Sequence, residues 1–124
     1  MEMPNYSYLP FDVLWEFEAV GDAGKKEVDF TNELGIVAKS LYVENVNQLG
    51  TITVELSFNG QDIGRTITLP PGARRNYEVQ DRVRIWKIRA SCTVVGGQLA
   101  VGATPGEWSD EEWAAYLTEM GVSL

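Results

Sequence analysis

The sequence contains no histidine and only one cysteine, Cys92. Histidine is the commonest general base and the commonest zinc and copper ligand, so the usual Ser-His and Cys-His nucleophile pairs are excluded. One cysteine without histidine cannot complete a structural zinc site, which takes four ligands. The composition therefore predicts neither a metal nor any other cofactor, and it gives no sign of an oxidising compartment.

Long apolar runs are also missing, and none approaches the ~18 residues that a membrane-spanning helix requires. The chain begins Met1-Glu2-Met3, which is not the basic start of a secretory signal, and no apolar core of a signal follows. Gly96-Gly97 is not followed by the lysine and helix of a phosphate-binding loop. We therefore expect no secretory signal, no membrane partner and no nucleotide site.

Acidic side chains outnumber basic ones by 18 to 10, which gives a net charge of −8. Nucleic-acid binding needs a basic footprint for the phosphates, so this balance argues against it. Residues 65–90 carry seven bases and two acids, whereas residues 91–124 carry five acids and no base. This segregation predicts ion pairs, either between neighbouring strands or between the basic patch of one molecule and the acidic end of another.

The strongest predicted element is a strand from Trp86 to Val94, where apolar or small residues alternate with polar ones. A period of two predicts one buried face, on which Cys92 would be an inert thiol. Gly96-Gly97 then favours a tight hairpin turn, because glycine adopts positive φ at little cost. The predicted cross-strand pairs are Val94 with Leu99, Cys92 with Val101, and Ala90 with Ala103.

Alternation predicts another clear strand from Thr51 to Phe58, and Asn59-Gly60 after it favours a two-residue hairpin turn. That turn would pair Val54 with Arg65, a basic residue on the inward face. Arg65 therefore indicates either a bulge at Gly64 or an edge strand whose side chain reaches water. Two prolines end this strand, in the segment 69–72. Further segments with an inward apolar face are 13–20, 28–31, 36–46 and 73–79.

The two ends of the chain differ from its middle. Residues 1–11 hold two prolines and no helical period, which predicts an extended arm that packs on its own domain or on a neighbour. Near the other end, Ser109 and Glu112 form a capping box flanked by two tryptophans, which predicts one short amphipathic helix. The apolar residues of arm and helix that could contact a partner are Tyr6, Tyr8, Leu9, Phe11, Trp108, Trp113 and Tyr116.

These patterns predict an all-β fold of about eight antiparallel strands, either a β-sandwich or a jelly roll. The arm would occupy residues 1–11, the strand domain 12–104, and the C-terminal helix and tail 105–124. Edge strands need protection from unwanted pairing, and the arm and helix are the predicted covers, within one molecule or between molecules.

Residues 41–90 resemble small structural proteins of tailed bacteriophages, such as head-decoration or cement proteins and related tail and fibre modules. The resemblance lies in short strands, Leu-Tyr-Val-Glu-Asn and Thr-Ile-Thr-Val-Glu-Leu, then Ile-Thr-Leu-Pro-Pro-Gly and Ile-Trp-Lys-Ile-Arg-Ala. It implies a virion protein, made in the host cytoplasm, that binds a symmetric shell as a trimer or other oligomer and catalyses nothing. It carries over no functional residue, because there is no site motif to match.

The favoured function is therefore a non-enzymatic assembly protein, with itself or a larger shell or tail as its partner. The apolar residues of arm and helix named above, together with Arg74, Arg75 and Arg84, are its candidate interface. One alternative is a carbohydrate- or ligand-binding module, since exposed aromatic rings stack on sugars; Trp15 and Trp86, however, fall on inward faces. Another is a hydrolase that uses only Glu16 and Glu18, whose carboxyls would lie roughly 7 Å apart by strand geometry.

The arm hypothesis makes one prediction. Deleting residues 1–11 should weaken self-association and leave the fold intact, because the apolar arm residues would no longer reach a neighbour. Light scattering of the full and shortened chains measures this, with circular dichroism as the check on folding. Unchanged assembly after the deletion would contradict the hypothesis.

Overall fold

A computed structural model describes residues 11–33, 37–79 and 83–104, together with Glu111, Ala114 and Thr118. The described elements are strands apart from a 3₁₀ turn, η1, and a single helical turn, α1. Their bounds are β1 Phe11–Glu16, η1 Gly21–Gly24, β2 Lys26–Asp29, α1 Phe30–Glu33, β3 Ser40–Asn45, β4 Ile52–Ser57, β5 Ile63–Leu69, β6 Arg74–Glu78, β7 Lys87–Cys92 and β8 Gln98–Thr104.

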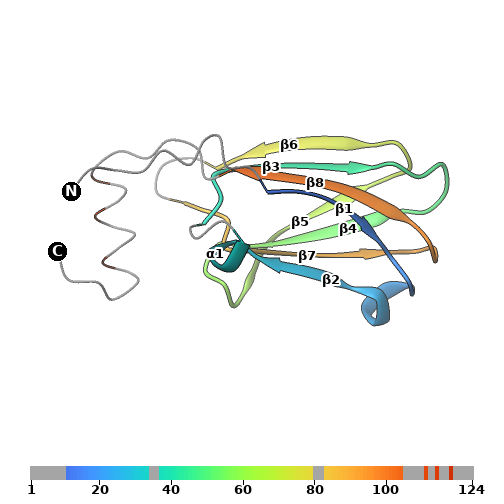
Figure 1. The fold of residues 1–124 in the computed structure, drawn as a ribbon, viewed down its shortest axis with the longest axis horizontal. Helices are drawn as coiled ribbons and strands as arrows, with labels where there is room; N and C mark the ends of the chain where they lie inside the picture. Colours follow the sequence, from blue (N-terminus) through green and yellow to red (C-terminus); the bar gives the residue numbers. More distant parts are fainter. Residues whose placement is uncertain are drawn as a thin grey trace.

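The strands form two antiparallel four-stranded sheets, which lie as two layers in Figure 1. Sheet A has the order β1-β8-β3-β6, and sheet B has the order β2-β7-β4-β5. The strands pair from the outside of the series inward, the first with the last and the second with the second-last. The pairs are β1 with β8, β2 with β7, β3 with β6, and β4 with β5. Two further pairings, β3 with β8 and β4 with β7, complete the sheets. The prediction of an all-β fold is confirmed.

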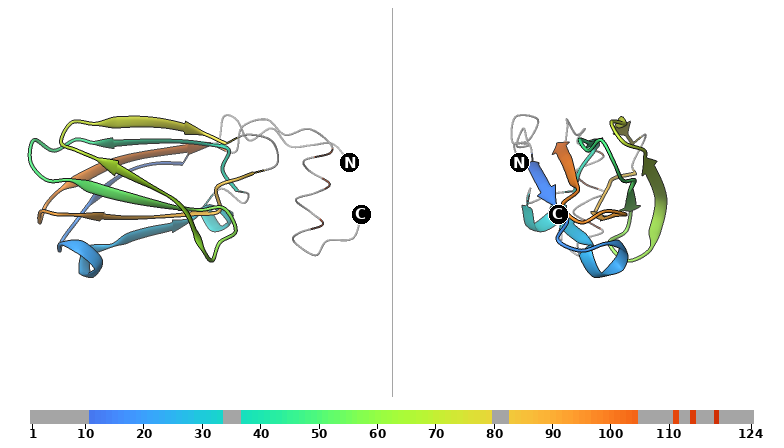
Figure 2. Two further views of the ribbon diagram at one scale, coloured as in Figure 1. Left: turned by 180° about the vertical axis from the view of Figure 1, so that it is seen from behind. Right: turned by 90° about the vertical axis from the view of Figure 1, so that its right-hand side faces the viewer.

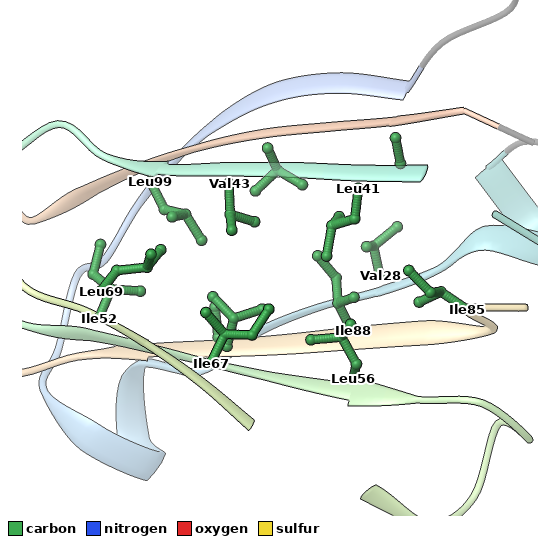
Figure 3. Packing of buried hydrophobic residues seen from close by; sticks show 14 of the residues in the cluster. Val28, Leu41, Val43, Ile52, Leu56, Ile67, Leu69, Ile85, Ile88 and Leu99 are labelled. Atoms are coloured by element: carbon green, nitrogen blue, oxygen red, sulfur yellow. The ribbon is translucent and has the colours of Figure 1, made fainter. Parts of the chain in front are cut away.

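One hydrophobic core fills the space between the sheets, and Figure 3 shows side chains from both layers pointing toward each other. Alternation along the strands explains it: β3 buries Leu41 and Val43, and β4 buries Ile52, Val54 and Leu56. Successive strand residues face opposite sides, so each strand gives every second side chain to the core. The inward faces predicted for these two segments are confirmed, and Cys92 is a buried free thiol.

The predicted hairpin between Trp86–Val94 and the following strand is wrong. Four of its five predicted inward residues, Ile88, Ala90, Cys92 and Val94, belong to the core cluster or pack against it, whereas Trp86 is half-buried and lies outside that cluster. β7 and β8 lie in different sheets, so their buried residues face each other across the core instead of lying side by side. The two glycines lie in the loop that connects β7 in one sheet to β8 in the other. Gly96 has φ +80°, which favours glycine, and a Cβ on Gly97 would lie 2.4 Å from Cys92 Sγ. Gly96 N donates to Phe17 O at 2.7 Å, which ties this crossing to the end of β1.

The turn at Asn59-Gly60 is longer than the predicted two residues, because Ser57 pairs with Ile63 and leaves residues 58–62 as the loop. Asn59 Oδ1 accepts hydrogen bonds from the backbone N–H groups of Gln61 and Asp62, both at 2.8 Å, which stabilises the wider turn. The register consequently differs by two from the predicted one. Observed pairs are Leu56 with Arg65, Val54 with Ile67, and Ile52 with Leu69.

Both explanations offered for Arg65 apply. The β4·β5 register shifts between Leu56 and Ser57, so Gly64 is the extra residue of a bulge, and β5 is an edge strand of sheet B. A Cβ on Gly64 would lie 2.3 Å from the Phe58 ring, which explains why glycine occupies the bulge. β5 then ends at Leu69, directly before the two prolines, as predicted.

Asn45, at the end of β3, is fully buried and joins segments that belong to both sheets. Its Nδ2 donates to Leu69 O at 2.9 Å and to Gly50 O at 3.0 Å. Its Oδ1 accepts from Asn47 Nδ2 at 2.8 Å, and Asn47 Nδ2 also donates to Gln98 O at 3.1 Å. A buried amide with every group satisfied fixes the relative position of the segments that it bonds.

We expect Asn45→Ala to lower the free energy of unfolding by about 2–4 kcal/mol, because it leaves the buried carbonyl of Leu69 and the half-buried carbonyl of Gly50 without their donor. Denaturant unfolding followed by tryptophan fluorescence measures the change. Asn32→Ala, at an exposed position of α1, is the control and should change stability by less than about 0.5 kcal/mol. Equal effects of the two substitutions would refute this role for Asn45.

Candidate functional site

Four of the predicted interface residues lie in the described part of the chain, and the structure does not bring them together as one patch. They are Phe11, Arg74, Arg75 and Arg84. The other six lie outside the described residues: Tyr6, Tyr8, Leu9, Trp108, Trp113 and Tyr116. Within the predicted C-terminal helix, Glu111, Ala114 and Thr118 are helical, and Thr118 Oγ1 donates to Ala114 O at 2.8 Å.

Phe11 belongs to β1 and not to a detached arm. It is half-buried opposite Ala103 of β8, and its ring meets the Phe30 ring edge to face, with centroids 5.7 Å apart. This side chain therefore packs on its own domain, and residue 11 belongs to β1. A deletion that tests the arm should accordingly stop at Pro10.

Arg84 was predicted to supply surface charge to a partner, but its residue is only 4% exposed. Its Nη1 donates to Val83 O at 2.7 Å. Burial lowers the pKa of the guanidinium from its ordinary value, because a charged group loses hydration in the interior. Arg84 is thus part of the interior at the start of the β7 segment and not a surface residue of the folded chain.

Arg74 and Arg75 are both exposed on β6, which forms one edge of sheet A. Arg74 lies opposite Glu44 on the outer face of the sheet, and Arg75 lies opposite Val43 on the core-facing side. We call this pair of arginines the basic edge. Arg65 of β5 lies near it, because its guanidinium carbon is 5.0 Å from the centre of the Tyr77 ring on β6.

The opposite edge of sheet A is β1, whose exposed side chains include Asp12 and Glu16. We call these two residues the acidic edge. Leu14 lies between them and is 55% exposed. The end-on view in Figure 2 places blue β1 and the yellow-green β5–β6 region at opposite sides of the molecule. Sequence reasoning singled out Arg74 and Arg75 as interface candidates, but it considered Glu16 only as a catalytic candidate and did not single out Asp12.

The outer face of sheet B holds a network of ion pairs. Glu55 Oε1 lies 2.9 Å from Lys25 Nζ and 3.4 Å from Arg89 Nε. Lys87 Nζ lies 3.2 Å from Glu27 Oε1. The hydrogen bond from Lys25 lowers the pKa of the Glu55 carboxyl, and the same bond raises the pKa of Lys25. Lys87 and Arg89 are therefore paired with acids within the subunit. The exposed bases of the predicted basic region that the structure describes are Arg74 and Arg75 on β6 and Arg65 on β5, whose guanidinium lies over the Tyr77 ring.

Two surface hollows are large enough to hold a ligand. One, of about 780 Å³, lies at the end of sheet A where β1 and β3 begin, and its lining includes Asp12, Tyr42, Asn76 and Tyr77. There the Tyr42 hydroxyl donates to the Glu44 carboxylate, which raises the pKa of the tyrosine. The other, of about 330 Å³, lies between the β3–β4 and β7–β8 loops.

The hollow between the β3–β4 and β7–β8 loops is lined by the two most exposed large apolar residues of the described chain. Leu49 is 76% exposed and Val95 is 68% exposed. Both lie at the end of the molecule where β3 turns into β4 and β7 crosses to β8 (Figure 1). A third hollow, of about 90 Å³ beside Glu55 and Lys87, is smaller than typical ligand pockets.

Among the described residues, no group of three or more aspartates, glutamates or cysteines is placed to hold a metal ion. No helix in that part of the chain is long and apolar enough to cross a membrane. A scan against protein-family models finds no match to this chain, and a search of curated proteins finds no relative. What the surface does must therefore be argued from its own geometry and charge.

The Glu55 network predicts how stability depends on pH. A carboxyl whose folded pKa is depressed contributes stability above its unfolded pKa, and this is lost as pH falls through the folded value. Thermal unfolding between pH 6 and pH 3 should therefore lose less stability in Glu55→Gln than in the natural chain. At pH 7 the substitution should cost about 0.5–1 kcal/mol.

Glu18→Gln is the matched control for this prediction. Glu18 is exposed and makes no ion pair among the described residues. Its variant should keep the acid sensitivity of the natural chain. The assignment to Glu55 fails if Glu55→Gln loses as much stability toward pH 3 as the Glu18→Gln control.

Proposed function

We propose that this chain is a non-enzymatic assembly protein with a jelly-roll fold, and that it serves as a structural component of a bacteriophage virion. The observation that carries the fold is the pairing of opposite members of the strand series, β1·β8, β2·β7, β3·β6 and β4·β5. A long antiparallel hairpin of four strand pairs, rolled so that alternate pairs fall in opposite layers, has this connectivity. Jelly rolls of eight strands occur in viral capsid domains and in lectins.

The charge distribution supports assembly as the function of this fold. The basic edge and the acidic edge lie on opposite margins of sheet A, whereas Lys87 and Arg89 on sheet B are paired with acids of the same molecule. Complementary charge on two separate surfaces favours contact between molecules and selects its orientation. The resemblance of residues 41–90 to phage structural proteins agrees with this function and gives the virion as its setting.

The carboxylates argue against acid–base catalysis in the described part of the chain. Glu55 is the most enclosed of the ion-paired acids, with a side chain only 15% exposed, and Lys25 lowers its pKa. A general acid at neutral pH needs the opposite shift, as burial among apolar groups produces. Glu16 and Glu18, the hydrolase candidates, are exposed at and just after the end of β1. The proposed protein therefore works through contacts and not through chemistry.

Carbohydrate binding is the second candidate function, and the large hollow at the end of sheet A favours it. Aromatic and hydrogen-bonding side chains, which are the groups that recognise sugars, share its lining: Tyr42, Tyr77, Asp12, Asn76 and Ser40. A lectin is also a common setting for a jelly roll. This function predicts that a glycan panel changes the intrinsic fluorescence of the natural chain and that Tyr42→Ala abolishes the change.

The assembly function predicts a concentration-dependent oligomer. Light scattering of the full chain between about 1 and 100 μM should give a mass that rises to a defined multiple of 13.8 kDa. Raising NaCl from 50 mM to 500 mM should shift the equilibrium toward monomer, because salt screens exposed charges. A monomer at every concentration, together with a positive glycan panel, would replace this proposal with the second function.

A further inference from the structure

We propose that self-association occurs by sheet extension, in which β6 of one copy pairs antiparallel with β1 of the next copy. The occupant of each sheet margin is therefore a second copy of this chain, placed head to tail. This inference rests on the assembly function proposed above and specifies the surface that performs it. It is argued from the backbone of the two margins, from strand direction and from charge.

The first step concerns the backbone at the two margins of sheet A. Within the described residues, β6 pairs with β3 alone, and β1 pairs with β8 alone. An edge strand presents a row of N–H and C=O groups on its outer side, which can pair with another strand. Four of the five residues of β6 are exposed: Arg74, Arg75, Asn76 and Glu78.

The second step concerns strand direction. Sheet A contains three successive antiparallel pairings, from β1 to β8, from β8 to β3, and from β3 to β6. β6 therefore runs opposite to β1. A copy related by rotation about an axis along the strands brings its β1 beside β6 in the antiparallel orientation. The new pair would continue the hydrogen-bond pattern that the sheet already has.

The third step concerns charge and register. Continuing the existing rows without a stagger places Arg74 opposite Leu14 of the neighbour, on the outer face, and diagonal to both its Asp12 and its Glu16. Asn76 then lies opposite Asp12, and Glu78 is the one acid of β6 that becomes diagonal to Asp12, so the two arginines outnumber it in this contact. Diagonal neighbours in a sheet are about 7–8 Å apart, within reach of an arginine side chain. On the other face Arg75 becomes diagonal to Trp15, where a cation–π contact can form.

The same charges oppose the other ways of joining two copies. Pairing of two β1 strands would bring four carboxylates together with no base between them, and pairing of two β6 strands would bring four arginines together with only the two exposed Glu78 carboxylates. Like charges placed directly across a contact are unfavourable. The contact is therefore heterologous, so it builds a closed ring where the rotation between copies permits closure, and an open array otherwise.

Charge reversal at each edge tests the contact. The double variant Arg74→Glu with Arg75→Glu, and the double variant Asp12→Lys with Glu16→Lys, should each weaken self-association about a hundredfold in light scattering. Mixing the two variants should restore association in open arrays and in rings of even number, because the variants then alternate and every β6 meets a β1 of opposite charge. The quadruple variant, with both edges exchanged, should associate with itself.

Glu33→Lys with Asp62→Lys is the matched control for the Asp12→Lys with Glu16→Lys variant, since it makes the same change in net charge at exposed positions outside β1 and β6. It should retain the natural oligomer, and circular dichroism should give the same spectrum for every variant. A monomeric natural chain would refute the assembly function itself. A natural oligomer that both reversals leave intact, or that neither mixing nor the quadruple variant restores, would refute only the contact between β6 and β1.

Discussion

The structure depends on antiparallel pairing between segments that are far apart in the sequence. β1 pairs with β8 and β2 pairs with β7, so the beginning of the described chain is held against its end in both sheets. Apart from β4 and β5, which pair in sheet B, this nesting separates consecutive strands into opposite layers, and it leaves one core between them. It also decides which strands become margins, because β1 and β6 each have a single partner in sheet A among the strands that the structure describes. The candidate interface is a consequence of that connectivity and not of any local motif.

Alternation in the sequence predicted which residues are buried, but it could not predict which strands are neighbours. Ala90 and Cys92 were correctly assigned to an inward face, as were Leu99 and Val101, yet β7 and β8 belong to different sheets. A period of two reports the face of a strand, because every second side chain points the same way. The choice of partner depends on the core as a whole. A glycine pair fits a tight hairpin and a crossing between layers equally well, since both need positive φ or close approach.

The charges illustrate the same limit at the candidate site. The excess of bases in residues 65–90 was visible in the sequence, but the structure divides them into groups with different roles. Lys87 and Arg89 pair with acids on sheet B, Arg84 is buried, and Arg74 and Arg75 are exposed on an edge strand. Neighbouring positions along the chain fall in different environments because the strands that carry them lie in different layers. Asn45 was not singled out in the sequence for a related reason: its partners, Leu69 and Gly50, meet it only after folding.

Exposed strand edges normally have to be protected against aggregation, and charge is one of the usual means. Two edges of the same sign would simply repel all copies. Opposite signs on the two margins of one sheet act differently, because they discourage the pairing of identical edges and favour the pairing of unlike ones. The same residues can therefore prevent indiscriminate aggregation and specify an ordered head-to-tail contact. For a protein proposed to assemble on a symmetric shell, that selectivity is more useful than a strongly apolar interface, because the chain must stay in solution until its partners are present.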